Sequence, residues 1–402
     1  MKTLLTLLAF LLVSLPLSAQ FVSVKGKNYI DPDGKVLFLR GTNLGNWLVP
    51  EGYMFKFKKT GSPSQINQVL TELIGPEETD KFWTEYYKVY TTEGDIQQIK
   101  KLGFNHIRVP FNFRLVMNET GSKAIKPDFF PMMDKLLTWC EKAGIYVVFD
   151  MHCAPGGQTG DNIDDSFGFP WLFDSPDMQD RAILIWTEFA KRYQDRTIVI
   201  GYDLLNEPIA HYFNADTLNP KLEPLYKRMT AAVREFDKNH LIFLGGAQWD
   251  SNFKPFGKPF DDKLVYTFHK YWTAPDVSVI QDYLDFSEKY QVPLWMGESG
   301  ENKNEWIATF TQTLETNNVS WCYWPYKKMD AESSPMTFKK PADWDLIVNF
   351  AESDRSTFEN IRKNRPDQKK VREILKELLE NCKAENATVN QGYVKALGLK
   401  YQ

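Results

Sequence analysis

Short apolar stretches and amphipathic stretches alternate along most of the chain. The apolar stretches are rich in β-branched and aromatic residues and carry apolar residues on both faces, as strands buried in a parallel sheet do. They cover residues 36–44, 104–110, 145–151, 198–205, 241–245, 264–268, 292–296 and 319–324. Apolar residues at helical spacing predict helices at 93–102, 130–143, 180–193, 225–236, 279–290, 304–314 and 371–381. Eight such strands favour a closed barrel over an open sheet, so the predicted fold class is α/β, a (β/α)8 TIM barrel.

Residues 1–19 differ in character from the rest of the chain. Lys2 precedes an apolar stretch from Leu4 to Val13, and the small residues Ser18 and Ala19 follow. This order is typical of a secretory signal peptide, and the stretch is shorter than the roughly 20 residues of a membrane span. We therefore expect a secreted protein, extracellular or periplasmic, with no membrane insertion after the signal is removed.

The remainder, residues 20–402, contains no linker rich in Pro, Gly or Ser that would divide it. We expect a single barrel domain, monomeric, with an exposed helix and a frayed end after Asp367. The 43% hydrophobic and 14% aromatic residues suffice for a large core and leave aromatic rings that could stack on sugars. A net charge of -4 argues against a nucleic-acid partner.

Cysteine and histidine spacing argue against a metal site. The four cysteines lie far apart, and the five histidines form neither H-x-H nor H-E-x-x-H pairs. We expect buried free thiols, no metal and no cofactor. The acidic residues Asp161, Asp164 and Asp165 lack the spacing of a calcium loop and are interpreted as a solvated loop.

Polar residues follow the apolar strands where a barrel carries its active face, at the carboxyl ends of the strands. In chain order they are Asn43, Glu51, Arg108, His152, Asn206, Glu207, His269, Tyr271, Glu298 and Trp324. Glu207 and Glu298 follow strands on opposite sides of the predicted barrel mouth. Two carboxyl groups across one pocket suit a retaining glycosidase, in which one is a proton donor and the other an ionised nucleophile about 5–5.5 Å away.

These segments together resemble glycoside hydrolase family 5, the cellulase-like retaining β-glycosidases. The matching motifs are "IRVP", "DMH", "NEP", "HKY", "GES" and "YWPY", in the family's order over nearly the whole mature chain. The resemblance implies that Glu207 is the acid/base and Glu298 the nucleophile. It also implies that Asn206 holds the sugar 2-hydroxyl and that Arg108 lies beneath the nucleophile.

The same resemblance implies roles for four more side chains. Tyr271 would hydrogen-bond to Glu298, and Trp324 would form the floor of the −1 subsite. His152 and His269 would contact sugar hydroxyls and orient the carboxylates.

A narrower resemblance concerns the exo-β-1,3-glucanase branch of the family. The segments "GTNLGNWLVPEGYM" and "HCAPGGQTGDN" are similar to it, and there the glutamate that matches Glu51 lines a closed pocket for the terminal glucose. Pro50, Asn46 and Gly300 depart from that branch. The implied substrate is therefore a β-glucan or a related β-linked polysaccharide or oligosaccharide, cleaved either by exo or by endo action.

Other functions and other residues remain open. A non-catalytic carbohydrate-binding barrel, a transglycosylase and a β-mannanase are alternatives to a β-glucanase, whereas the lack of paired histidines opposes a metal-dependent hydrolase. Trp47 is expected in the core, and His106 is as easily structural as functional. Trp171, Trp249 and Trp272 either stack on sugars or pack against the protein.

Overall fold

The computed structural model describes residues 21–400. The predicted signal peptide at residues 1–19 lies outside this part of the chain, so it stays a prediction. Within residues 21–400, no helix is both long and apolar enough to cross a membrane. All four cysteines lie in the described part and are buried and unpaired, as expected.

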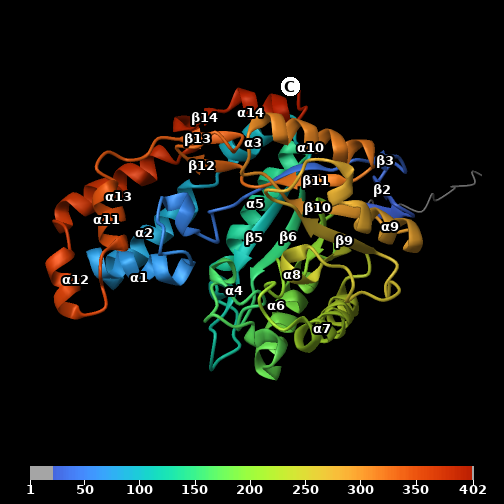
Figure 1. Ribbon diagram of the computed structural model, residues 1–402, viewed down its shortest axis with the longest axis horizontal. Coiled ribbons are helices and arrows are strands. Elements are labelled where there is room, and N and C mark those ends of the chain that lie inside the picture. The colour runs from blue at the N-terminus through green and yellow to red at the C-terminus, as the bar shows by residue number, and fades with distance from the viewer. Residues whose placement is uncertain (1–20, 401–402) are drawn as a thin grey trace, which may run out of the picture.

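Eight parallel strands close into a barrel, which confirms the predicted (β/α)8 fold (Figure 1). They are β4 (Arg40–Asn43), β5 (His106–Asn112), β6 (Tyr146–Cys153), β7 (Val199–Asp203), β8 (Leu241–Gly245), β9 (Leu264–His269), β10 (Leu294–Glu298) and β11 (Ser320–Tyr323). Each strand pairs with the next in the chain, and β11 closes the ring by pairing with β4. Every residue of β8 is buried, which explains why its sequence shows no polar face.

Helices cover the outside of the barrel where helical spacing predicts them. They are α3 (Glu93–Lys101), α5 (Phe129–Ala143), α6 (Pro176–Tyr193), α7 (Ala215–Phe236), α9 (Gln281–Tyr290) and α10 (Asn304–Thr316). In α5, the buried residues Met133, Leu136, Leu137 and Cys140 recur at three- and four-residue intervals and form one apolar stripe. The connection between β8 and β9 contains a single short helix, the four-residue α8 (Ala247–Asp250).

The prediction of one strand over residues 36–44 is wrong. Val36–Leu37 forms β3, which joins β1 (Ser23–Lys25) and β2 (Asn28–Ile30) in an antiparallel sheet outside the barrel. Val36 is 63% exposed, so the apolar run does not mark one continuously buried strand. Tyr29 of this sheet packs with barrel-interior residues, and its hydroxyl donates to the Leu294 carbonyl at the start of β10. The small sheet therefore covers the end of the barrel opposite the active face.

Two further helices, α1 (Pro63–Ile74) and α2 (Pro76–Val89), fill the long connection between β4 and β5. They pack against α13 (Gln368–Asn381), and with α11 (Asp345–Glu352) and α12 (Phe358–Asn364) they form a layer on one side of the barrel (Figure 1).

The expectation of a frayed end after Asp367 is wrong. Beyond α13, β14 (Thr388–Val389) pairs with β13 (Met336–Phe338), which in turn pairs with β12 (Lys327–Met329). The last helix, α14 (Gln391–Ala396), packs on α10 (Figure 1). Tyr393 and Leu397 are each 1% exposed. These two apolar side chains, four residues apart, anchor the end of the chain in the core.

Candidate active site

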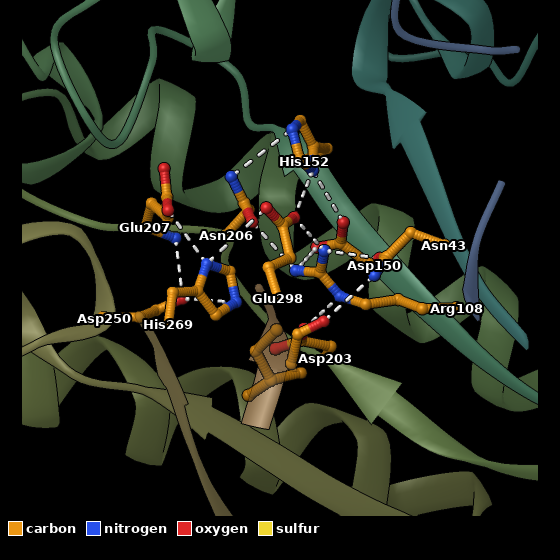
Figure 2. A network of polar contacts seen from close by, with 12 residues as sticks. Asn43, Arg108, Asp150, His152, Asp203, Asn206, Glu207, Asp250, His269 and Glu298 are labelled. Carbon is orange, nitrogen blue, oxygen red and sulfur yellow. Dashed lines mark hydrogen bonds and ion pairs between the residues drawn. The ribbon is translucent and has the colours of Figure 1, made fainter. Parts of the chain in front are cut away.

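Glu207 and Glu298 meet at the carboxyl ends of the barrel strands (Figure 2). Glu298 is the last residue of β10, and Glu207 follows β7 by four residues. Three atoms lie within 4.8 Å of one another: a carboxylate oxygen of Glu207, a carboxylate oxygen of Glu298 and a ring nitrogen of His269. The side chains of Glu207 and Glu298 keep 15% and 7% of their surface exposed. The sequence analysis expected this pair to converge, and the structure brings it together.

Arg108 of β5 lies beneath Glu298 and is fully buried (Figure 2). Its Nη1 donates to Glu298 Oε1 at 2.5 Å, and its Nη2 donates to Asn206 Oδ1 at 2.8 Å. Its Nε donates to Asp203 Oδ2 at 2.8 Å, and its Nη2 lies 3.1 Å from Asp150 Oδ1. One guanidinium therefore anchors three carboxyl groups that burial alone would disfavour as anions.

Asp150 and Asp203 are additions to the site that the sequence analysis missed. They lie within β6 and β7, and burial raises the pKa of each to about 7 even though Arg108 opposes the shift. A signal for them existed, because an aspartate inside an otherwise apolar strand is a buried acid that requires a partner. Asp150 also accepts a hydrogen bond from Nδ1 of His152 at 2.8 Å.

His152 and Asn206 form the next layer around the carboxylates. Nδ2 of Asn206 lies 3.4 Å from Nε2 of His152. Burial lowers the pKa of His152 to about 4, so the ring is neutral near pH 7 and can accept this hydrogen bond at Nε2. The Asn206 amide is thus held from both ends, by His152 and by Arg108.

Glu207 sits in a strained backbone position with defined partners. Its φ angle of 44° is left-handed, which is uncommon for a residue with a side chain. Its Oε1 lies 2.9 Å from Nδ1 of His269, and its backbone amide donates to Asp250 Oδ2 at 3.0 Å. Burial raises the pKa of Glu207 to about 7, against the lowering effects of His152 and Arg108. Burial also lowers the pKa of His269 to about 3, which keeps that ring neutral.

Tyr271 and Trp324 border the two carboxylates. The Tyr271 hydroxyl donates to Glu298 Oε2 at 3.0 Å. The Trp324 ring stacks on the His152 ring, with centroids 5.5 Å apart and planes at 10°. Its Nε1 donates to the Tyr53 hydroxyl at 2.8 Å, and that hydroxyl donates to Glu301.

Glu51 lies among the same acids and is 7% exposed. Burial raises its pKa first, and the charges of Glu298, Glu207 and Glu301 raise it further, while Lys328 opposes the shift. Lys328 forms an ion pair with Glu301 at 2.6 Å. Neither member of this pair was singled out from the sequence, nor was Tyr53.

The remaining candidates have different positions. His106 is buried at the other end of β5, with its ring against Gly41, and Trp47 is buried in the core as expected. Trp171 and Trp272 are 49% and 76% exposed. Their role in sugar binding stays a prediction.

The interpretation of the acidic segment at 161–165 as a solvated loop is wrong for two of its residues. Asp164 is fully buried and its Oδ2 accepts hydrogen bonds from the backbone amides of Thr159 and Gly160. Asp165 is 3% exposed and forms an ion pair with Arg114. These carboxylates organise the loop after β6 from within.

The sequence model of the family described as "Cellulase (glycosyl hydrolase family 5)" matches residues 58–330. The chain belongs to glycosyl hydrolase family 5. Among family-5 relatives, a "Beta-xylosidase" of Phanerodontia chrysosporium is 33% identical over 290 residues, which are 71% of this chain and 59% of the relative. An "Endoglucanase C" of Acetivibrio thermocellus is 26% identical over 328 residues, covering 66% of this chain and 92% of the relative.

A third relative is the "Probable glucan 1,3-beta-glucosidase A" of Aspergillus fumigatus, 26% identical over 209 residues, 51% of this chain and 49% of the relative. The chain thus spans little more than half the length of the xylosidase and about half of the glucosidase. The expected enzyme class, O-glycosyl hydrolase, is confirmed at the level of family 5. The three relatives carry three different substrate names, so the family alone does not fix the substrate.

Solved structures agree with the barrel. The crystal structure of Thermotoga maritima Cel5A in complex with mannotriose has a TM-score of 0.53 at 19% identity, covering 72% of this chain and 90% of that one. A structure titled "Crystal structure of AoRut" has a TM-score of 0.60 at 17% identity, covering 72% and 89%. At these identities the likeness concerns the fold alone.

Proposed function

We propose that this protein hydrolyses the β-glucosidic bonds of a β-glucan by double displacement, with Glu298 as nucleophile and Glu207 as acid/base. The observation that carries the proposal is the separation of the two glutamates, whose nearest oxygens lie within 4.8 Å. Retaining glycosidases hold their carboxyl groups about 5–5.5 Å apart, whereas inverting enzymes leave about 6.5–9.5 Å for a water molecule.

The surroundings of the two groups support different roles. Glu298 receives hydrogen bonds from Arg108 and Tyr271, both of which favour a carboxylate that can attack. Among residues 21–400, the neutral His269 is the only hydrogen-bond partner of the Glu207 side chain, and the pKa of Glu207 near 7 keeps a large share of it protonated at neutral pH. An acid with a pKa close to the working pH is suited to donate and then retrieve a proton.

The proposed reaction has two steps. In the first, a Glu298 oxygen forms a bond to the anomeric carbon while the glycosidic bond breaks, and the Glu207 proton passes to the leaving oxygen. In the second, the Glu207 carboxylate takes a proton from water, the water oxygen bonds to the anomeric carbon, and Glu298 is released. In this proposal Asn206 holds the sugar 2-hydroxyl, and the contacts of its amide with Arg108 and His152 support that role.

The choice of a β-glucan rests on the relatives named endoglucanase and glucan 1,3-beta-glucosidase, together with Glu51 beside the catalytic pair. The relative named beta-xylosidase supports a β-xyloside as the second candidate. The chain is further proposed to act as a secreted monomer after removal of residues 1–19. Expression of the full sequence, with N-terminal sequencing and light scattering of the product in the medium, tests this part.

The purified chain should be incubated with β-1,3-, β-1,4- and β-1,6-glucans, mannan and xylan, and the released sugars resolved over time. Glucose alone from the first minutes would support exo action, and a ladder of oligosaccharides would support endo action. Glu298→Gln and Glu207→Gln are the matched controls, since each keeps the side-chain shape. Binding without release from any polymer would instead support the non-catalytic alternative, and transfer products without net hydrolysis would support the transglycosylase.

A further inference from the structure

We propose that Asp250 is a positioning residue that holds Glu207 in place, through the Glu207 backbone amide and through His269. The inference rests on the acid/base role proposed above for Glu207. Asp250 follows β8 by five residues and is fully buried. Its side chain makes one hydrogen bond within residues 21–400, and that bond is with Glu207.

Asp250 lies beside both the Glu207 backbone and the ring of His269 (Figure 2). Its Oδ2 accepts the backbone amide of Glu207 at 3.0 Å and lies 3.3 Å from Nε2 of His269. The other ring nitrogen of His269, Nδ1, lies 2.9 Å from Glu207 Oε1. The backbone of Glu207 is therefore bonded directly to Asp250, and the His269 ring that contacts the Glu207 side chain packs against the same buried carboxyl group.

The backbone that delivers Asp250 is strained. Gln248, Trp249 and Asp250 have φ angles of 52°, 58° and 56°, so three consecutive residues with side chains are left-handed. Such conformations persist only where surrounding contacts enforce them, and they gather at functional sites. Glu207, with its φ of 44°, is left-handed as well. Two strained segments from different strand ends thus meet at the hydrogen bond between Asp250 and Glu207.

The last residue of β8 supports the same interpretation. A Cβ atom at Gly245 would lie 2.0 Å from Asp250 Oδ1. The absence of a side chain at Gly245 is what allows the carboxylate to approach Glu207. An aspartate that stabilised only its own loop would hydrogen-bond within residues 246–252. The Asp250 carboxylate instead accepts its hydrogen bond from Glu207, in the segment that follows β7.

Leaving-group dependence distinguishes a positioning role from a structural one. A misplaced proton donor slows the departure of a poor leaving group, such as phenol, more than that of an acidic one, such as 2,4-dinitrophenol. Asp250→Ala should therefore lower kcat/KM at least about tenfold more for the phenyl β-glycoside than for the dinitrophenyl one, with the sugar taken from the substrate panel. Asp250→Asn should restore most of the loss, because its amide oxygen can accept the Glu207 amide proton.

A second variant leaves Asp250 itself intact. Gly245→Ala should displace the carboxylate and give the same leaving-group-dependent loss, so the proposal can be decided even if Asp250→Ala does not fold. Asp237→Asn is the matched control, because Asp237 is another fully buried aspartate beside β8 that contacts a histidine, His240, at the opposite end of the strand. In Asp237→Asn, kcat/KM should change by the same factor for the phenyl and the dinitrophenyl substrate.

Glu207→Gln, measured alongside, separates the two proposals. If Glu207→Gln shows leaving-group dependence while Asp250→Ala and Gly245→Ala lower both rates equally or not at all, the role of Asp250 is overturned and that of Glu207 stands. If Glu207→Gln shows no such dependence, the acid/base assignment fails, and the inference on Asp250 fails with it.

Discussion

The pKa of Glu207 makes a specific prediction for the pH dependence of catalysis. Burial raises this pKa from 4.5 to about 7, and the group must be protonated when it donates to the leaving oxygen. Activity on a poor leaving group should therefore be highest below pH 7 and fall as the pH rises through the pKa of the folded enzyme. For a single group the protonated fraction falls about tenfold per pH unit above its pKa, so kcat/KM should drop about a hundredfold two units above it.

The assay is kcat/KM against pH for a phenyl glycoside, with the dinitrophenyl glycoside of the same sugar as control. The dinitrophenyl substrate needs no proton from Glu207, so it should lack this basic limb. Burial also raises the pKa values of Asp150 and Asp203 to about 7, but both are fully buried against Arg108, so their titration would affect both substrates. His269 is neutral throughout this range because burial lowers its pKa to about 3.

Two results would refute the reasoning. One is a basic limb with its midpoint near pH 5 or below, which would mean that burial does not raise the pKa of Glu207. The other is an equal limb for both substrates that also survives in Glu207→Gln, which would assign the titration to another group.

Further predictions concern hydrogen bonds and buried charges. Tyr271→Phe removes a hydrogen bond to Glu298 worth about 1.5–3 kcal/mol, so kcat/KM should fall roughly 10- to 150-fold, and an unchanged rate would contradict the proposed role. Arg108→Met leaves three buried carboxyl groups without their cation and should lower the free energy of unfolding by about 3–5 kcal/mol in urea titrations at pH 7. Lys327→Met breaks the fully buried pair with Asp95 and should be about as destabilising, while the rate per folded molecule stays unchanged.

The barrel could be predicted because each strand has a simple physical signature. Strands such as β8 are buried on both faces, so their sequences are continuously apolar, and polar residues at the carboxyl ends of the other strands mark the active face. The run at 36–44 misled the prediction because β3 and β4 belong to different sheets, although no polar residue separates them. Helices α1 and α2 lie outside the alternating pattern, and their apolar faces pack against a helix from the far end of the chain.

The site residues that directly follow a strand could be predicted from the sequence. Those that reach the site through contacts between distant parts of the chain could not. Glu207 and Glu298 each follow an apolar strand, which is a local signal. Asp250 reaches Glu207 only because three left-handed residues redirect the chain, and Gln248 and Trp249 are residue types with no preference for that conformation. Tyr53 likewise contacts Trp324 across a sequence separation of 271 residues, which no local pattern can indicate.

The anomeric configuration of the first-formed product tests the central claim most directly. The purified protein should be given a β-linked oligosaccharide that it cleaves, and proton NMR should follow the new reducing end before mutarotation mixes the anomers. Double displacement at Glu298 predicts the β anomer as the initial product. Initial release of the α anomer would mean a single displacement by water and would contradict the assignment of Glu298 as nucleophile.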